Sequence, residues 1–235
     1  MTSSENLLLA LIESQRLPRR TRDIATSLLL LSAPPEHTRL WGQLGRGIRE
    51  GTLAADARLL RGMYPSLPRR LKIQLAASFA ASALEAKTFK LLFEDALRKC
   101  RPDRQERVLL ARSLSRFFDL HPELSARGLG ASIRLLLHSR AEEERAHALL
   151  VVDRLERLRE DELQIILADA RSRSRALSTN AWLALSLLAR KNGALNPSVI
   201  VALRRLAEAR LAKSSEPARV NIRQFSRLTR RSALR

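Results

Sequence analysis

The segment Arg107-Val-Leu-Leu-Ala-Arg-Ser-Leu-Ser-Arg-Phe117 gives the strongest indication of the fold, because similar segments recur along the chain. Arg70-Leu-Lys-Ile-Gln-Leu-Ala-Ala-Ser-Phe-Ala80 begins 37 residues earlier, and Arg145-Ala-His-Ala-Leu-Leu-Val-Val-Asp-Arg-Leu155 begins 38 residues later. Each segment places apolar residues three and four positions apart, the spacing of one face of an α-helix. Two further steps of 37 residues lead to Trp182, where the match is poorer, and to Arg219. A period near 37 residues is typical of a two-helix repeat unit.

The same apolar spacing continues along nearly the whole chain. Prolines and glycines separate most of the helical stretches. No segment keeps a strict alternation of apolar and polar residues, so we predict no β-sheet. The sequence therefore predicts an all-α fold, with helices at about residues 5–15, 20–32, 36–50, 53–63, 68–84, 86–98, 102–120, 121–138, 142–158, 161–170, 175–191, 197–213 and 217–231.

The helix pairs over residues 68–231 resemble HEAT-type and armadillo-type repeats. The closest matches are Glu106–Phe117 and Glu144–Leu155, where an acidic and a basic residue open an Ala- and Leu-rich helix. The resemblance implies a right-handed α-solenoid of HEAT-like helical hairpins; an irregular multi-helix bundle is the alternative. We expect a single helical-repeat domain over residues 1–235, with an irregular N-terminal cap over residues 1–65 and more regular repeats over residues 66–235.

The chain is strongly basic. It has 43 Lys and Arg residues against 24 Asp and Glu residues, a formal charge of +19. Such an excess attracts polyanions. A preference for arginine codons would explain Arg in place of Lys, but it would not explain an excess of base over acid. Aromatic residues are 4% of the chain and mostly occupy core-like positions, so contact with a duplex backbone is favoured over base stacking.

The C-terminal helix carries the first predicted nucleic-acid-binding residues. Arg219, Arg223 and Arg227 are spaced four residues apart, so they form a row on one helical face. An apolar edge of Ile222, Phe225 and Leu228 opposes this row, and Arg230 and Arg231 extend it. Each guanidinium group can hold one phosphate through two hydrogen bonds. We therefore predict phosphate contact along this helix.

Two predicted turns supply the other basic clusters. The first holds Arg98, Lys99, Arg101 and Arg104, and the second holds Arg171, Arg173 and Arg175 with serines between them. Equivalent turns of a solenoid line up along one edge. The clusters would then form a basic stripe.

The sequence gives little sign of an active site. Its four histidines are dispersed, and its single cysteine, Cys100, excludes both an intrachain disulfide and a cysteine-based metal site. We expect no catalytic residues, no metal and no cofactor. The residues Met1–Asn6 lack the basic region of a signal peptide, and the apolar runs are too short to span a membrane. We expect no membrane partner and a cytoplasmic location, at the nucleoid if the source is bacterial.

The chain is also distantly similar to HEAT-like alkylpurine DNA glycosylases. That resemblance implies a concave duplex-binding groove with Trp and Asp residues near the lesion. Trp182 is present, but Ser186 stands four residues later where an acid is expected, and Asp169 is only a substitute from the preceding helix. The sequence therefore favours a non-catalytic nucleic-acid-binding protein, with DNA preferred over RNA. A scaffold for an acidic protein and a HEAT-like DNA glycosylase are the alternatives.

Overall fold

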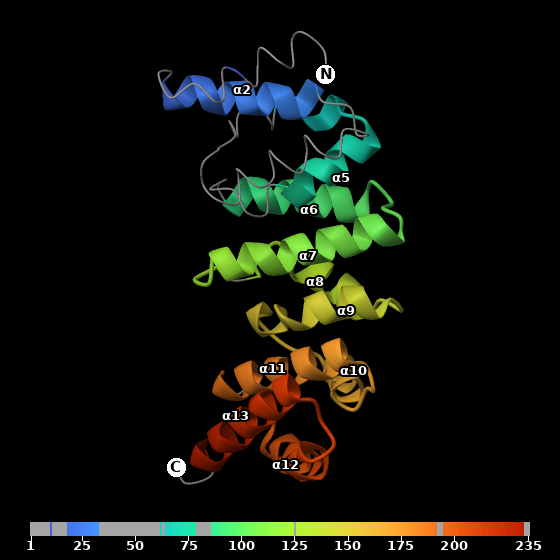
Figure 1. The fold of residues 1–235 in the computed structure, drawn as a ribbon, viewed down its shortest axis with the longest axis vertical. Coiled ribbons are helices and arrows are strands. Elements are labelled where there is room, and N and C mark those ends of the chain that lie inside the picture. The colour runs from blue at the N-terminus through green and yellow to red at the C-terminus, as the bar shows by residue number, and fades with distance from the viewer. Residues whose placement is uncertain are drawn as a thin grey trace. The chain divides into compact units, whose positions relative to one another are not determined.

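The computed structural model describes residues 18–32, 64–78, 86–124, 126–191 and 195–232, together with Ala10 and Gly62 (Figure 1). Every regular element in these ranges is helical, and none of these residues lies in a β-strand. The predicted all-α fold is therefore confirmed. Apart from Ala10 and Gly62, the helices predicted at about 5–15, 36–50 and 53–63 lie outside the described residues. No helix within the described ranges is long and apolar enough to cross a membrane.

The chain divides into two compact units, Met1–His121 and Pro122–Arg235. The described helices of the first unit are α2 (Arg19–Ser32), α5 (Arg69–Ser78), α6 (Ala86–Arg98) and α7 (Arg104–Leu120), with a 3-10 turn at Tyr64–Ser66. Helices α5, α6 and α7 contact one another. Their core includes Phe89, Phe93 and Phe117, and the rings of Phe89 and Phe117 stack with centroids 4.1 Å apart. Aromatic burial of this kind is a main source of stability.

The second unit repeats a pairing of neighbouring helices. Its elements are α8 (Gly130–Leu137), α9 (Glu142–Leu149), the 3-10 turn η3 (Val152–Arg154), α10 (Glu160–Ala170), α11 (Arg175–Arg190), α12 (Pro197–Leu211) and α13 (Glu216–Ser232). The pairs α8 and α9, α10 and α11, and α12 and α13 are each in contact. Helix α11 also packs against both α9 and α13, and α10 contacts α8. Within this unit, consecutive helix pairs therefore stack. The solenoid for the whole chain stays a prediction.

Several helix ends agree with the prediction because local residues determine them. Helix α6 has the predicted bounds. Helix α7 follows a capping box, in which the Asp103 carboxylate accepts from the Glu106 N–H at 2.9 Å and the Glu106 carboxylate accepts from the Asp103 N–H at 2.8 Å. Pro197 opens α12 after the Asn196 side chain, which caps its first turn.

Two predicted helices are wrong in extent. The helix predicted over residues 121–138 is only α8, because Gly128 adopts a left-handed φ of 86° and residues 122, 123 and 127–129 form turns. The helix predicted over residues 142–158 ends as α9 at Leu149. The chain becomes extended at Leu155, whose carbonyl oxygen accepts a hydrogen bond from the Lys191 ammonium group at 2.6 Å. That long-range contact has no signature in local periodicity.

Candidate nucleic-acid interface

The turn between α10 and α11 presents three of the predicted arginines. Arg171 follows the last residue of α10, Arg173 lies in the turn and Arg175 is the first residue of α11. All three residues are exposed. None of the three forms an ion pair with another described residue. Among those residues, therefore, no carboxylate neutralises these guanidinium groups by direct contact. The Ser172 hydroxyl oxygen accepts a hydrogen bond from the Ser174 N–H at 3.0 Å and shapes the turn.

The turn between α12 and α13 lies beside this one. Arg210, in the last turn of α12, donates a hydrogen bond from its guanidinium group to the carbonyl oxygen of Arg171. Arg219 of α13 reaches back to the carbonyl oxygen of Ala212 at 3.3 Å, and Lys213 is exposed between them. We call this cluster the paired turns; its cations are Arg171, Arg173, Arg175, Arg210, Lys213 and Arg219.

Helix α13 extends from the paired turns with one buried and one basic face. Its buried residues include Ile222 and Phe225, as predicted, and Phe225 meets the Trp182 ring edge-on with centroids 5.8 Å apart. Leu228 is only partly buried. The Asn221 side chain donates to the carbonyl oxygen of Thr179 at 3.0 Å, which anchors α13 on α11. Helix α13 is therefore held in one rotational setting, with Arg223 and Arg227 exposed.

Glu216 is the acidic residue at the start of this basic row. Its carboxylate lies 3.4 Å from the Arg219 guanidinium group and 3.9 Å from that of Arg223. Both arginines keep large exposed fractions, 39% and 56% of their side chains. Exposed pairs of this kind are weak, so they leave the arginines available to another anion. The side chains of Arg230 and Arg231 lie outside the described residues, although their backbone continues α13.

The predicted basic stripe does not continue to the turn between α8 and α9. Arg140 is exposed there, but the exposed Glu142 and Glu143 follow it at the start of α9. The stripe within the second unit is therefore limited to the paired turns and α13.

The turn between α6 and α7 brings together the predicted first-unit cluster. Arg98 pairs with Glu94 at 3.5 Å, and Lys99 pairs with Asp95 at 3.0 Å, one helical turn earlier in each case. Arg101 and Arg104 are exposed. Arg101 has a left-handed φ of 46°, a conformation that costs a non-glycine residue on the order of 1 kcal/mol. Two of the four predicted cations thus have nearby acids.

Arg69 shapes this first-unit turn. Its guanidinium group donates to the carbonyl oxygens of Cys100 at 2.5 Å and Arg101 at 2.8 Å, and to the Glu106 carboxylate at 2.7 Å. One arginine therefore satisfies two carbonyl groups that a turn leaves without helical partners. Burial, reinforced by Asp95, raises the pKa of the Cys100 thiol, which disfavours the reactive thiolate.

Other arginines are internal cross-links. The Arg134 guanidinium group lies 2.6 Å from the fully buried Glu162 carboxylate. That of Arg145 lies 3.1 Å from Asp169, whose side chain is 6% exposed. Arg145, which the sequence repeat placed at a helix start, thus links α9 to α10 through an ion pair.

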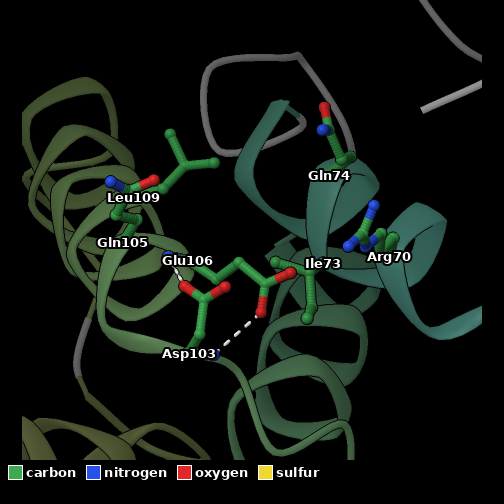
Figure 2. A pocket seen from close by; sticks show the side chains of 7 residues that line it. All are labelled: Arg70, Ile73, Gln74, Asp103, Gln105, Glu106 and Leu109. Atoms are coloured by element: carbon green, nitrogen blue, oxygen red, sulfur yellow. Dashed lines mark hydrogen bonds between the residues drawn. The ribbon is translucent and has the colours of Figure 1, made fainter. Parts of the chain in front are cut away.

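A pocket of about 240 Å³ lies in the first unit. Figure 2 shows its lining, which comes from α5 and the start of α7: Arg70, Ile73, Gln74, Asp103, Gln105, Glu106 and Leu109. The two carboxylates are occupied by the α7 capping box and by Arg69. No group of three metal-ligating side chains occurs among the described residues. The residues named for the glycosylase alternative do not form an open site, because Trp182 is fully buried and Asp169 is paired with Arg145.

Sequence reasoning missed Arg210 and Lys213. The signal was present, since Arg210 follows Arg171 by 39 residues, close to the repeat period, and both residues precede a serine-containing turn.

No protein-family model matches the sequence, and no curated protein is similar to it in sequence. In three dimensions the chain is similar to an engineered protein whose crystal structure was determined as a Northeast Structural Genomics Consortium target. The two are 16% identical, the alignment covers 98% of each chain, and the TM-score is 0.53. This likeness supports the helical fold and carries no functional information.

Proposed function

We propose that this chain is a non-catalytic nucleic-acid-binding protein that contacts the phosphate backbone of duplex DNA, in preference to RNA. The observation that carries the proposal is the convergence of six cations on the paired turns, from which the basic row of α13 continues. Guanidinium groups suit this role because their planar donors match phosphate oxygens.

The aromatic side chains favour backbone contact. Tyr64, Trp182 and every described phenylalanine are buried. A protein that binds single strands usually stacks bases on exposed aromatic rings. Because the described surface offers no such ring, we expect binding that depends weakly on base sequence and strongly on salt.

The test is the affinity of the full chain for a fluorescent DNA duplex across a salt series. If six phosphates are neutralised, the logarithm of the association constant should fall against the logarithm of salt concentration with a slope of about −5. A duplex RNA of the same length tests the preference for DNA. Absence of binding at low salt, or an affinity that does not change with salt concentration, contradicts the proposal.

Helix α13 gives a direct variant. Replacement of Arg219, Arg223 and Arg227 by Glu should weaken binding by at least 100-fold, on the order expected when three phosphate contacts become repulsive. Helicity should be unchanged, because the buried face of α13 stays intact. The matched control replaces three exposed arginines at or near the opposite helix ends, Arg127, Arg157 and Arg190, and should bind nearly as well as the parent.

An acidic protein segment is the second candidate ligand. One observation favours it: Val220 is 53% exposed on α13, between Arg219 and Arg223. An apolar contact inside a basic row suits a peptide that carries both acidic and apolar residues. Purification after nuclease treatment separates the candidates, since a retained protein without nucleic acid supports the scaffold. Replacement of Val220 by Ser should then release that protein, and it should leave DNA affinity unchanged.

A further inference from the structure

The turn Arg171–Arg175 alternates arginine and serine, and its two serines differ in their contacts. The Ser172 hydroxyl oxygen accepts the Ser174 N–H and so belongs to the turn. Ser174 precedes α11 with an extended backbone, at φ −63° and ψ 119°, and its side chain forms no capping hydrogen bond. Ser174 is partly exposed between exposed arginines. The Ser172 hydroxyl group thus takes part in the turn, whereas the Ser174 hydroxyl group does not cap α11.

We propose that Ser174 is a phosphorylation site that switches the paired turns from binding to releasing a polyanion. The Ser174 oxygen attacks the γ-phosphorus of a nucleoside triphosphate held by a protein kinase. The bond from that phosphorus to the β-phosphate oxygen breaks, the nucleoside diphosphate leaves, and the hydroxyl proton passes to a base of the kinase. The consequence for binding rests on the proposed function; the modification itself does not.

The arginines around Ser174 select the class of kinase. Arg171 and Arg173 stand three and one residues before Ser174, and Arg175 follows it. A kinase with an acidic peptide-binding cleft prefers a serine in this setting, because charge pattern is a main source of kinase specificity. Ser172 has Asp169 at the corresponding earlier position, so Ser174 is the favoured acceptor.

The same arginines would hold the product. A phosphoserine carries nearly two negative charges near neutral pH and three acceptor oxygens, and it pairs readily with clustered guanidinium groups. Arg210 is already fixed at this turn by its hydrogen bond to the Arg171 carbonyl oxygen. A phosphate at Ser174 would therefore occupy cations that otherwise contact the DNA backbone, and it would repel that backbone.

The first test introduces phosphoserine at position 174 of the full chain during translation. Its control is phosphoserine at Ser198, an exposed residue in the first turn of α12, far along that helix from Arg210. Both positions lie at the start of a helix and gain the same charge. A difference between their phosphate pKa values therefore measures the effect of the arginines around Ser174. In a phosphorus NMR titration, the phosphate pKa at 174 should fall about one unit below that at 198, since guanidinium groups favour the dianion.

The second readout is DNA affinity. Phosphoserine at 174 should weaken duplex binding about 10-fold or more, and phosphoserine at 198 by less than 3-fold. Equal phosphate pKa values at the two positions would overturn the proposed site. Unchanged DNA affinity in a protein that does bind DNA would overturn the switch. A lowered pKa at 174 in a chain that never binds DNA would refute the proposed function and leave the modification site standing.

The third readout is modification itself. A purified kinase that prefers basic substrates should label the full chain, and Ser174→Ala should remove at least nine-tenths of the label. Replacement of both Arg171 and Arg173 by Gln should reduce labelling similarly, because kinase recognition depends on these charges. Label that persists in Ser174→Ala, or that appears on Ser172, contradicts the assignment.

Discussion

The turn between α6 and α7 and the turn between α10 and α11 both carry runs of cations, yet they differ in charge compensation. In the first turn, Arg98 and Lys99 each have a carboxylate within 3.5 Å. In the second, Arg171, Arg173 and Arg175 form no ion pair with a described residue, and Arg210 adds a fourth cation. The number of arginines in a turn therefore does not give its available charge. The neighbouring acids and the turn packed alongside decide it.

The two turns are also held differently. Arg69 fixes the first with a side chain that is 44% exposed, whereas Arg145, which supports the helix preceding the second, is 18% exposed and meets a nearly buried Asp169. Buried ion pairs are costly to break, because one charge is left without a partner away from water. The second unit should thus depend more strongly on its arginine cross-link.

The largest expected effect is on this cross-link. Replacement of Arg145 by Met should lower the free energy of unfolding of the second unit by about 3 kcal/mol, since Asp169 would stay buried without its partner. Urea unfolding followed by circular dichroism measures the change. Arg140→Met, at an exposed neighbour, is the control and should change it by less than about 0.5 kcal/mol. A loss below about 1 kcal/mol for Arg145→Met would remove this distinction between the units.

The next largest effect is on DNA affinity, and it depends on how many cations in each turn have no carboxylate partner. Replacement of Arg171, Arg173 and Arg175 by Gln should weaken duplex DNA binding by about 30-fold and make the salt slope less steep by about 3. These arginines have no ionic competitor among the described residues, so their loss removes phosphate contacts directly.

The corresponding change in the first unit is the matched comparison. Replacement of Arg98, Lys99 and Arg101 by Gln removes the same number of charges but should weaken binding by only about 5-fold, because two of the three already face carboxylates. Equal losses for the two triple variants would show that charge number alone governs binding.

A smaller effect is expected for the first-unit cross-link. Arg69→Met should lower the free energy of unfolding by about 1 kcal/mol, as solvent screens its pair with Glu106 and two carbonyl groups lose a donor. Thermal unfolding of the full chain reports the change, with the exposed neighbour Arg70→Met as control. A loss of unfolding free energy as large as that of Arg145→Met would mean that the greater solvent exposure of Arg69 does not make its cross-link weaker.

The smallest effect is conformational. Arg101→Gly relieves the left-handed backbone at φ 46° but makes the unfolded chain more flexible, so the net stabilisation should be between zero and about 1 kcal/mol. Urea unfolding checks the sign. Destabilisation beyond about 1 kcal/mol would show that the Arg101 side chain makes contacts essential to the turn, in contrast to the free arginines of the second turn.

Much of the candidate site was readable from the sequence. The serine–arginine alternation at residues 171–175, the four-residue spacing of Arg219, Arg223 and Arg227, and the opposing Ile222 and Phe225 are all local patterns. The structure confirms the exposure of Arg223 and Arg227 and the burial of Ile222 and Phe225. It adds Arg210, because its role depends on a contact with a turn 39 residues earlier.

The sequence alone is enough to make this chain helical, since apolar spacing, proline positions and capping residues act within a few residues of each other. It also determined the excess of positive charge. Which arginines form internal pairs and which face solvent depends on how the helices pack in three dimensions. Arg145 with Asp169, and Arg210 with the Arg171 carbonyl group, are joined by the packing of separate helix pairs. Such contacts depend on how helices stack, which local periodicity does not encode.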